Sequence, residues 1–403
     1  MQGGALSHVR VLDLSRVLAG PWASQLLADL GAEVVKIERP GTGDETRGWG
    51  PPFLTTPEGT ETRESAYFAC TNRGKKSVTV DLARPEGQAI VRRLAERSDV
   101  LLENFKVGSL SRLGLGWEEL SALNPRLVYC SITGFGQSGP YRDRPGYDFA
   151  IQAMGGLMSV TGQPDGEPMK AGVAMTDILT GMYVATAVLA ALAHRERTGE
   201  GQRVDLALLD VQVATLANLA ESYLVTGRVP DRLGNAHASI VPYQAFATKD
   251  GYLVVAVGND AQFARLCELS GRPDLVADPR FTTNPARVEN RATLVPILQA
   301  IFAGRPTRDW VVALQGAGVP CGPINDLAQV FGDPHVRARG LRVEVPHALA
   351  GSLPVVASPM RLSRTPVSLG TPPLLGEHTD EVLRNVLGME SSEIENLRRE
   401  KVI

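Results

Sequence analysis

The sequence predicts an α/β protein with a doubly wound parallel sheet, accompanied by a smaller α+β domain. The first part rests on strand patterns that alternate with helical patterns between residues 9 and 135, an order that favours parallel pairing. The second part rests on a change near residue 240, where a hairpin pattern precedes several helical segments. A chain of 403 residues is long enough for more than one domain.

The N-terminal half supplies the strand–helix–strand units. An apolar strand at 9–14 precedes a helical pattern from Pro21 to Leu30, because proline suits the first turn of a helix, and a second strand follows at 33–38. The pattern then continues. The further elements expected in this half are a strand at 77–82, a helix at 85–97, a strand at 99–104, a helix at 117–122 and a strand at 126–135.

The most apolar helix is expected from Asp177 to about His194, with Thr176 as a possible N-cap. Its apolar core at 182–193 is too short for a membrane span. Residues 243–258 are expected to form a hairpin that turns at Asp250-Gly251. The remaining expected elements are a strand or helix at 203–210, helices at 260–269, 292–303, 307–317 and 378–387, and strand and loop at 341–366.

Composition excludes several classes of function. A formal net charge of -3 argues against a nucleic-acid binder, which usually carries a basic face. No cysteine or histidine spacing matches a metal site, so no metal is expected, and the four cysteines are expected to be reduced thiols. The N-terminal residues contain no basic segment followed by an apolar one, so no signal peptide is expected. The sequence therefore predicts a cytoplasmic protein with no membrane partner.

The turn after the first strand, residues 15–21, contains one glycine followed by Pro21. Dinucleotide-binding turns need closely spaced glycines so that backbone amides can approach a pyrophosphate, and proline also removes one amide donor. The sequence therefore disfavours a nicotinamide cofactor, although the fold prediction stands.

Several motifs together resemble the class III CoA-transferases, the CaiB–BaiF family, and they occur in the order of that family. The motifs are VLDLSRVLAGPWASQLLADLGAEVVKIERPGTGDETRGWG, NRGKKSVTVDL, ENFKVGSLSRLGLGW, YCSITGFGQSGP and PPLLGEHTDEVL. The sequence is most similar to those of succinyl-CoA:glutarate CoA-transferases, notably in the segments ERPGTGDETRGWGPPF and AGVAMTD.

The resemblance assigns the catalytic nucleophile to Asp177. Members of the family use an aspartate before an apolar helix, and GVAMTDILTG is the matching segment. A carboxylate at a helix N-terminus is expected to be stabilised as the anion, which is the form that attacks a thioester. An ordinary first-turn aspartate is the alternative. The resemblance implies aspartyl anhydride and aspartyl–CoA thioester intermediates, with coenzyme A as a substrate and no tightly bound cofactor.

Coenzyme A contacts are implied by matching positions. The residues concerned are Arg39, Asn104, Phe105, Arg112, Ile132, Thr133, Gly134 and Phe135. Relatives that act on oxalate carry glutamine in place of Leu18 and lysine in place of Thr133, so the resemblance does not favour oxalate.

The expected substrates are an acyl-CoA, such as succinyl-CoA, and a dicarboxylate such as glutarate. Arg47, next to Trp49, is the candidate for binding a second carboxylate, because arginine binds carboxylates through two parallel hydrogen bonds. His237 lies in a segment resembling the same subgroup, and a structural loop histidine is an equally good interpretation.

Two other functions remain as alternatives. The related α-methylacyl-CoA racemases need a histidine where this chain has Tyr147, and tyrosine is a poor general base at neutral pH. A non-catalytic CoA-binding protein would bind coenzyme A without exchanging it.

The resemblance also implies the domain arrangement. A large Rossmann-like, CoA-binding domain is expected from residues 1–210 and 330–403, and a small α+β domain from 225–325, with linkers at 211–224 and 326–329. Two chains are expected to form an interlocked homodimer.

Overall fold

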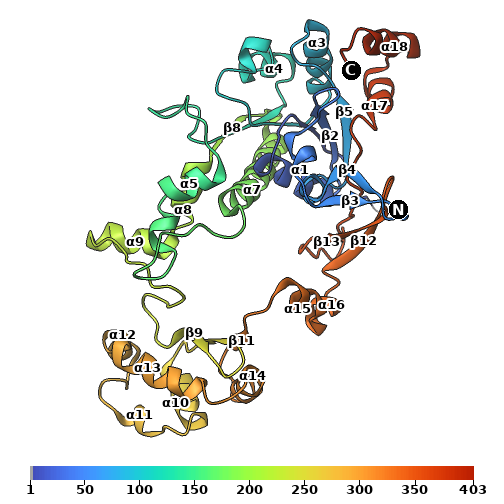
Figure 1. The fold of residues 1–403 in the computed structure, drawn as a ribbon. Coiled ribbons are helices and arrows are strands. Elements are labelled where there is room, and N and C mark those ends of the chain that lie inside the picture. The colour runs from blue at the N-terminus through green and yellow to red at the C-terminus, as the bar shows by residue number, and fades with distance from the viewer. Residues whose placement is uncertain (1–2) are drawn as a thin grey trace. The chain divides into compact units, whose positions relative to one another are not determined.

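The computed structural model describes residues 3–403 (Figure 1). Their contacts divide the chain into two compact units. The larger unit contains the chain up to Leu157, together with Ala171–Glu221 and His335–Ile403. The smaller unit contains Met158–Lys170 and Ser222–Pro334. The chain therefore leaves the larger unit twice and returns to it each time.

The larger unit is built on a parallel sheet, whose described strands follow the order β5-β2-β1-β6-β7-β8. The strands are β1 (Arg10–Asp13), β2 (Glu33–Glu38), β5 (Lys75–Thr79), β6 (Val100–Glu103), β7 (Val128–Thr133) and β8 (Arg203–Ala207). The chain starts in the middle, fills one edge through β2 and β5, and then fills the other edge. The predicted α/β class with a parallel sheet is confirmed, and this strand order is that of a doubly wound sheet.

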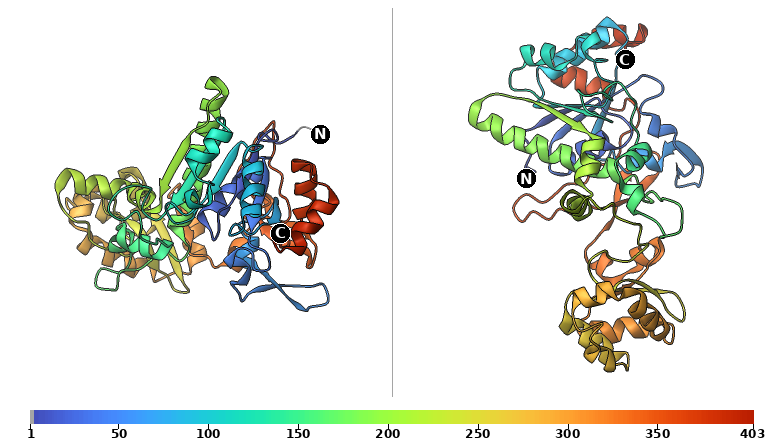
Figure 2. Two further views of the ribbon diagram at one scale, coloured as in Figure 1. Left: turned by 90° about the horizontal axis from the view of Figure 1, so that it is seen from above. Right: turned by 90° about the vertical axis from the view of Figure 1, so that its left-hand side faces the viewer.

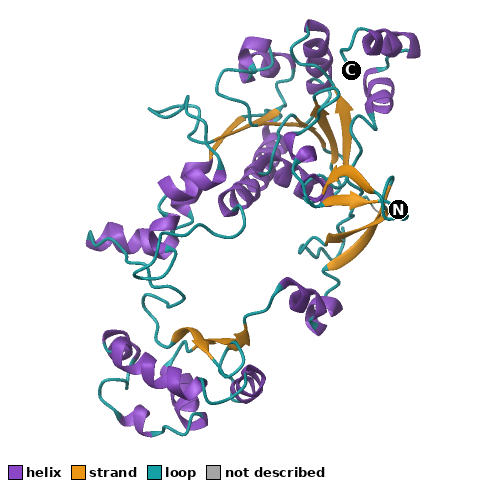
Figure 3. Ribbon diagram, in the orientation of Figure 1, coloured by secondary structure: helices purple, strands orange, loops and turns teal. Residues whose placement is uncertain are grey.

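Helices cover both faces of this sheet (Figure 3). The helices of the larger unit, including those at which the chain passes between units, are α1 (Ala19–Asp29), α2 (Ala66–Ala69), α3 (Pro85–Ala95), α4 (Trp117–Leu123), α5 (Asp148–Met154), α6 (Leu157–Val160), α7 (Met175–Thr198), α8 (Leu208–Ala214), α9 (Ala217–Thr226), α16 (Pro334–Ala338), α17 (Thr379–Leu387) and α18 (Ser391–Arg399). Short 3-10 turns are η1 (Glu45–Gly48) and η2 (Ser111–Leu113).

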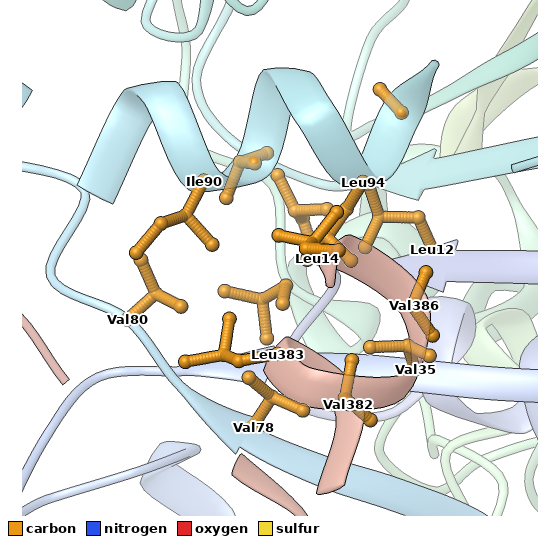
Figure 4. Close-up of a cluster of buried hydrophobic side chains, with 14 of the residues drawn as sticks. Leu12, Leu14, Val35, Val78, Val80, Ile90, Leu94, Val382, Leu383 and Val386 are labelled. Atoms are coloured by element: carbon orange, nitrogen blue, oxygen red, sulfur yellow. The ribbon is translucent and has the colours of Figure 1, made fainter. Parts of the chain in front are cut away.

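Strand side chains alternate between two buried clusters, because successive residues of a strand point to opposite faces. On β1, Leu12 belongs to the cluster under α3 and α17, whereas Val11 belongs to the cluster under α1 and α7. Figure 4 shows Leu383 of α17 and Ile90 of α3 in the first cluster. In the left view of Figure 2, the red C-terminal helices and the green α7 lie on opposite sides of the blue strands.

Helices α1 and α7 pack against each other at a glycine. A Cβ atom on Gly181 would lie 2.7 Å from the carbonyl oxygen of Ala19 and 2.9 Å from the ring of Trp22. Only glycine permits this approach. The contact places the N-terminus of α1 against the second turn of α7.

The helix starts differ from those expected. Helix α1 begins at Ala19 instead of Pro21, and α7 begins at Met175 instead of Asp177. The N-cap position of α7 is therefore Ala174, which has no side-chain acceptor. The prediction that Thr176 caps this helix is wrong, because Thr176 lies inside the first turn.

Within residues 3–403, α7 alone is long and apolar enough to cross a membrane, since it extends over 24 residues. The expectation of a shorter apolar stretch is corrected accordingly. In the structure, 44% of its most apolar stretch is buried, through residues such as Val184 and Val188 that pack with the sheet. A helix that covers a core satisfies the same length and composition criteria.

The smaller unit contains an antiparallel sheet in the order β11-β10-β9 with helices around it. Its elements are β9 (Tyr243–Ala247), β10 (Tyr252–Ala256), α10 (Asp260–Leu269), α11 (Asp274–Ala277), α12 (Asn284–Glu289), α13 (Arg291–Phe302), α14 (Thr307–Gly316), β11 (Cys321–Pro323) and α15 (Leu327–Gly332). The predicted hairpin is confirmed by the antiparallel pairing of β9 with β10. Two further hairpins belong to the larger unit, namely β3 (Phe53–Thr55) with β4 (Glu61–Ser65) and β12 (Arg342–His347) with β13 (Gly351–Val356).

Candidate active site

A cavity of about 190 Å³ opens at the carboxyl edge of the parallel sheet. It lies where the strand order reverses, between the loops after β1 and β6, which is the usual ligand position in doubly wound proteins. Six of the residues predicted as site residues line it, namely Asn104, Phe105, Ile132, Thr133, Gly134 and Asp177. The fold therefore brings together predicted residues from separate segments of the chain.

The loop after β1, which forms one wall, is held by side chains from other segments. The Asn104 side chain accepts from the Arg16 amide at 2.9 Å and donates to the Arg16 carbonyl at 2.7 Å. The next amide, that of Val17, donates to Asp44 at 3.3 Å. Val17 has a φ of 71°, which is strained for a β-branched residue. In this structure Asn104 thus fixes the cavity wall.

Two buried ion pairs support the same loop. Lys36 Nζ lies 3.0 Å from Asp44 Oδ2 and donates to the Ser15 carbonyl at 2.8 Å. Lys75 Nζ lies 3.2 Å from Asp13 Oδ2. Burial alone would raise the pKa of Asp13, but Lys75 and Lys36 hold it below its ordinary value. Removing any partner would leave an uncompensated buried charge.

Asp177 is the third residue of α7, is partly buried and lines the cavity. Burial, and then the negative charge of Asp148, raise its pKa to about 7. The helix N-terminus does not offset these effects, so the expectation of a carboxylate stabilised as the anion is wrong. When ionised, this carboxylate is a stronger base than an ordinary aspartate.

Asp148, the first residue of α5, occupies the capping role expected of Thr176. Its Oδ1 atom accepts from the Thr176 amide at 2.8 Å and from the Asp177 amide at 3.2 Å. Sequence reasoning missed this role, because Asp148 precedes these partners by 28 and 29 residues and no local pattern connects them.

A second cavity, of about 610 Å³, adjoins the first. Arg16, Glu45 and Phe105 line both cavities. Arg16 forms an ion pair with Glu45, and its guanidinium carbon lies 5.1 Å from the centre of the Phe105 ring. Arg39, which follows β2, lines the second cavity with an exposed side chain. Arg39 and Asp177 therefore line two adjoining cavities that share wall residues.

Two predicted ligand residues lie outside both cavities. Arg112, in η2, is exposed and donates to the Ser109 hydroxyl at 3.1 Å. Phe135 packs against Tyr141, with ring centres 5.6 Å apart, and against the apolar cluster under α7. The structure does not bring either residue to the wall of these cavities.

Arg47 is not available to a substrate. Its buried guanidinium donates to Glu38 through two nitrogens at 2.8 Å each, and to Glu64 at 2.9 Å. Its guanidinium carbon also lies 3.6 Å from the centre of the Phe68 ring. The prediction that Arg47 binds a second substrate carboxylate is therefore corrected, because its donors are paired within the protein.

Trp49 packs edge-on against Tyr67, with ring centres 5.1 Å apart. Burial, and then the nearby Asp177 carboxylate, raise the pKa of Tyr67 to about 12, so its hydroxyl remains a donor at neutral pH. Tyr67 is a second residue that sequence reasoning missed. His237 belongs to the smaller unit, where its Nδ1 accepts from the Ser239 amide at 3.0 Å.

No group of three or more His, Cys, Asp or Glu side chains within residues 3–403 is placed to hold a metal ion. The four cysteines are free thiols. The groups at the cavity are a carboxyl of raised pKa, backbone amides and several cations. This set suits nucleophilic attack by Asp177 on an activated carbonyl group.

Comparisons with known proteins agree over almost the whole chain. The family model described as CoA-transferase family III matches residues 6–379. A succinate–glutarate CoA-transferase of Agrobacterium fabrum is 52% identical over 379 residues, covering 94% of each chain. The succinyl-CoA:glutarate CoA-transferase of Homo sapiens is 46% identical, covering 95% of this chain and 86% of the human protein. The crystal structure of a CAIB/BAIF family protein from Brucella suis matches with a TM-score of 0.85 at 47% identity, covering 96% of this chain and all of that one.

Proposed function

Because this chain belongs to CoA-transferase family III and is a CoA-transferase, we propose that it moves coenzyme A from succinyl-CoA to a dicarboxylate such as glutarate, with Asp177 as the nucleophile. The observation that carries this assignment is the position of Asp177, which lines a cavity where the strand order reverses. Succinyl-CoA and glutarate are proposed as substrates because the relatives that are 52% and 46% identical are a succinate–glutarate CoA-transferase and a succinyl-CoA:glutarate CoA-transferase.

In the proposed reaction, the Asp177 carboxylate attacks the thioester carbonyl of the donor. The C–S bond breaks, which gives an aspartyl anhydride and CoA thiolate. The thiolate then attacks the aspartyl carbonyl, releasing the donor acid and leaving an aspartyl–CoA thioester. The acceptor carboxylate reacts with this thioester through the same steps in reverse. A raised pKa supports this role, because a more basic carboxylate is a better nucleophile.

Each attack produces an oxyanion that needs hydrogen-bond donors. Leu18 and Ala19 line the cavity at the start of α1, where backbone amides have no acceptor within their own helix. These amides are the proposed oxyanion donors, and such donors contribute about 3 kcal/mol each.

Coenzyme A is proposed to extend from the second cavity into the first. The exposed guanidinium of Arg39 would bind a phosphate of the nucleotide end. Phe105 lines both cavities and would contact the pantetheine chain, while Ile132, Thr133 and Gly134 would face the thioester end. Arg112 has no place in this path.

The second carboxylate of a diacid requires a cation near Asp177. Arg47 is excluded by its internal partners, whereas Lys106, Arg142 and Arg144 line the cavity that contains Asp177. One of these three cations is the proposed partner of the distal carboxylate.

An interlocked homodimer, acting in the cytoplasm, completes the proposal. Helix α7 exposes the apolar side chains of Met182, Tyr183 and Leu189. An apolar helix face of this kind usually meets a partner surface, and a second copy of the chain is the proposed partner. Sedimentation over a dilution series tests the dimer, and a stable active monomer would refute it.

The central test measures CoA exchange after removal of the carboxylate. Purified protein is incubated with succinyl-CoA and a panel of mono- and dicarboxylic acids, and new acyl-CoA species are measured by mass spectrometry. Asp177→Ala should show no transfer, whereas Asp210→Asn, which alters an exposed first-turn carboxylate of α8, should retain activity. Full activity of Asp177→Ala would disprove the nucleophile, and transfer restricted to monocarboxylates would disprove the diacid assignment.

A further inference from the structure

The carboxylate of Asp148 is held between two helices. Its Oδ1 atom accepts from the amides of Thr176 and Asp177 at 2.8 Å and 3.2 Å, in the first turn of α7. Its Oδ2 atom accepts from Gln152 Nε2 at 2.6 Å. The same Gln152 accepts from the Ala171 amide at 2.9 Å through its Oε1 atom. Both oxygens of Asp148 therefore have donors, and the side chain has a defined position.

The first turn of α7 depends on this external acceptor. The N-cap residue, Ala174, has no oxygen in its side chain, and the hydroxyl of Thr176 donates to Gln212 Oε1 at 2.6 Å. The amides of Thr176 and Asp177 donate instead to Asp148, which supplies the acceptor that the N-cap residue lacks. Asp177 is the third residue of this turn, and its backbone is fixed through its own amide.

The contact also brings a second negative charge toward Asp177. Apart from burial, the charge of Asp148 is what raises the pKa of Asp177. The other titratable or charged groups around the site are Tyr67 from α2, the Arg16–Glu45 pair, Lys106 after β6, Arg142, Asp143 and Arg144 after β7, and Tyr147 before α5. The cations in this set do not offset the effect of Asp148.

We propose that Asp148 is a positioning residue for the transfer reaction, which fixes the first turn of α7 and holds a negative charge against the nucleophile. Asp148 does not line the cavity, so it acts on the reaction through Asp177 and not through the substrate. The repulsion makes the Asp177 carboxylate more basic and hence more reactive toward the thioester. This inference rests on the proposed role of Asp177 as the nucleophile.

The test compares pH profiles of variants at one position. Asp148→Asn removes the charge at nearly constant size, Asp148→Glu keeps the charge, and Asp210→Asn is a matched control on an exposed carboxylate. For each folded variant, kcat/KM for succinyl-CoA is measured between about pH 5 and about pH 9, because this parameter reports ionisation in the free enzyme. Folding is checked by urea denaturation.

The acid limb of the Asp148→Asn profile should move down by about one pH unit, with a fall in kcat above neutral pH, because a neighbouring like charge is lost. Asp148→Glu should keep the acid limb of the parent protein while kcat falls, since the longer side chain displaces the capping oxygen. An unchanged acid limb in Asp148→Asn, or an equal shift in both variants, would overturn the inference. If only Asp148→Glu folds, a shift of the acid limb of its pH profile by a full pH unit would also overturn the inference. Transfer activity in Asp177→Ala would instead show that the nucleophile itself is misassigned.

Discussion

Acidification should slow the first half of the reaction in proportion to the protonation of Asp177. Its pKa of about 7 means that about 90% of the carboxyl groups are ionised at about pH 8 and about 10% at about pH 6. Only the anion attacks a thioester, so kcat/KM for succinyl-CoA should fall about tenfold over this interval. An aspartate with an ordinary pKa would stay almost fully ionised throughout, and the rate would not change.

The assay measures initial rates with saturating glutarate in buffers of constant ionic strength, corrected for spontaneous thioester hydrolysis. A phosphate monoester on coenzyme A also ionises near about pH 6, so the 3′-dephospho thioester serves as a matched substrate without that group. The acid limb should persist with both substrates. A flat profile between about pH 6 and about pH 8 with the dephospho substrate would refute the reasoning from burial and from Asp148.

Three further variants test the site. Asp177→Asn should raise the free energy of unfolding at about pH 8 by at most about 4 kcal/mol, because ionising a group whose folded pKa is raised destabilises the native state. This gain in stability should disappear below about pH 4, where Asp177 is protonated in both the folded and the unfolded state. If urea denaturation still shows the gain there, the raised pKa of Asp177 is not its cause. Arg47→Met should lower the free energy of unfolding by about 3–5 kcal/mol, because it removes the guanidinium that donates to both Glu38 and Glu64. An unchanged melting temperature with lost selectivity for diacids would restore Arg47 as a substrate ligand. Arg39→Ala should raise KM for succinyl-CoA about tenfold with little change in kcat, whereas Arg112→Ala should change neither parameter. Equal effects of the two variants would show that the proposed path of coenzyme A is wrong.

What the sequence predicted correctly depends on local patterns. Strand patterns at 9–14 and 33–38, with a helical pattern between them, indicated the parallel sheet, because this order favours parallel pairing. The hairpin of β9 and β10 followed from Asp250-Gly251 between two strand patterns. Asp177 was proposed from a motif, and the structure shows that it lines a cavity, which composition alone could not indicate.

What the sequence did not predict depends on partners that are distant along the chain. Arg47 follows a strand and resembles a ligand residue, but Glu38, Glu64 and the Pro373 carbonyl accept from its guanidinium, and the last of these lies 326 residues away in the sequence. Thr176 satisfied the composition rule for an N-cap, yet Asp148 supplies that acceptor from another helix. Burial, and then the charge of the distant Asp148, raise the pKa of Asp177, whereas the helix position alone favours the opposite shift.

The placement of residues 379–403 affects how this protein is made. Helices α17 and α18 cover one face of the sheet, and the Val402 carbonyl accepts from the Asp81 amide at 2.8 Å. A ribosome synthesises these residues after the whole smaller unit, so Leu12 and Val35 in early strands lack their final covering until then. During that interval this apolar sheet face has the cover of α3 but lacks that of α17 and α18. Chaperones that bind exposed apolar strands would therefore act mainly on the first half of the nascent chain.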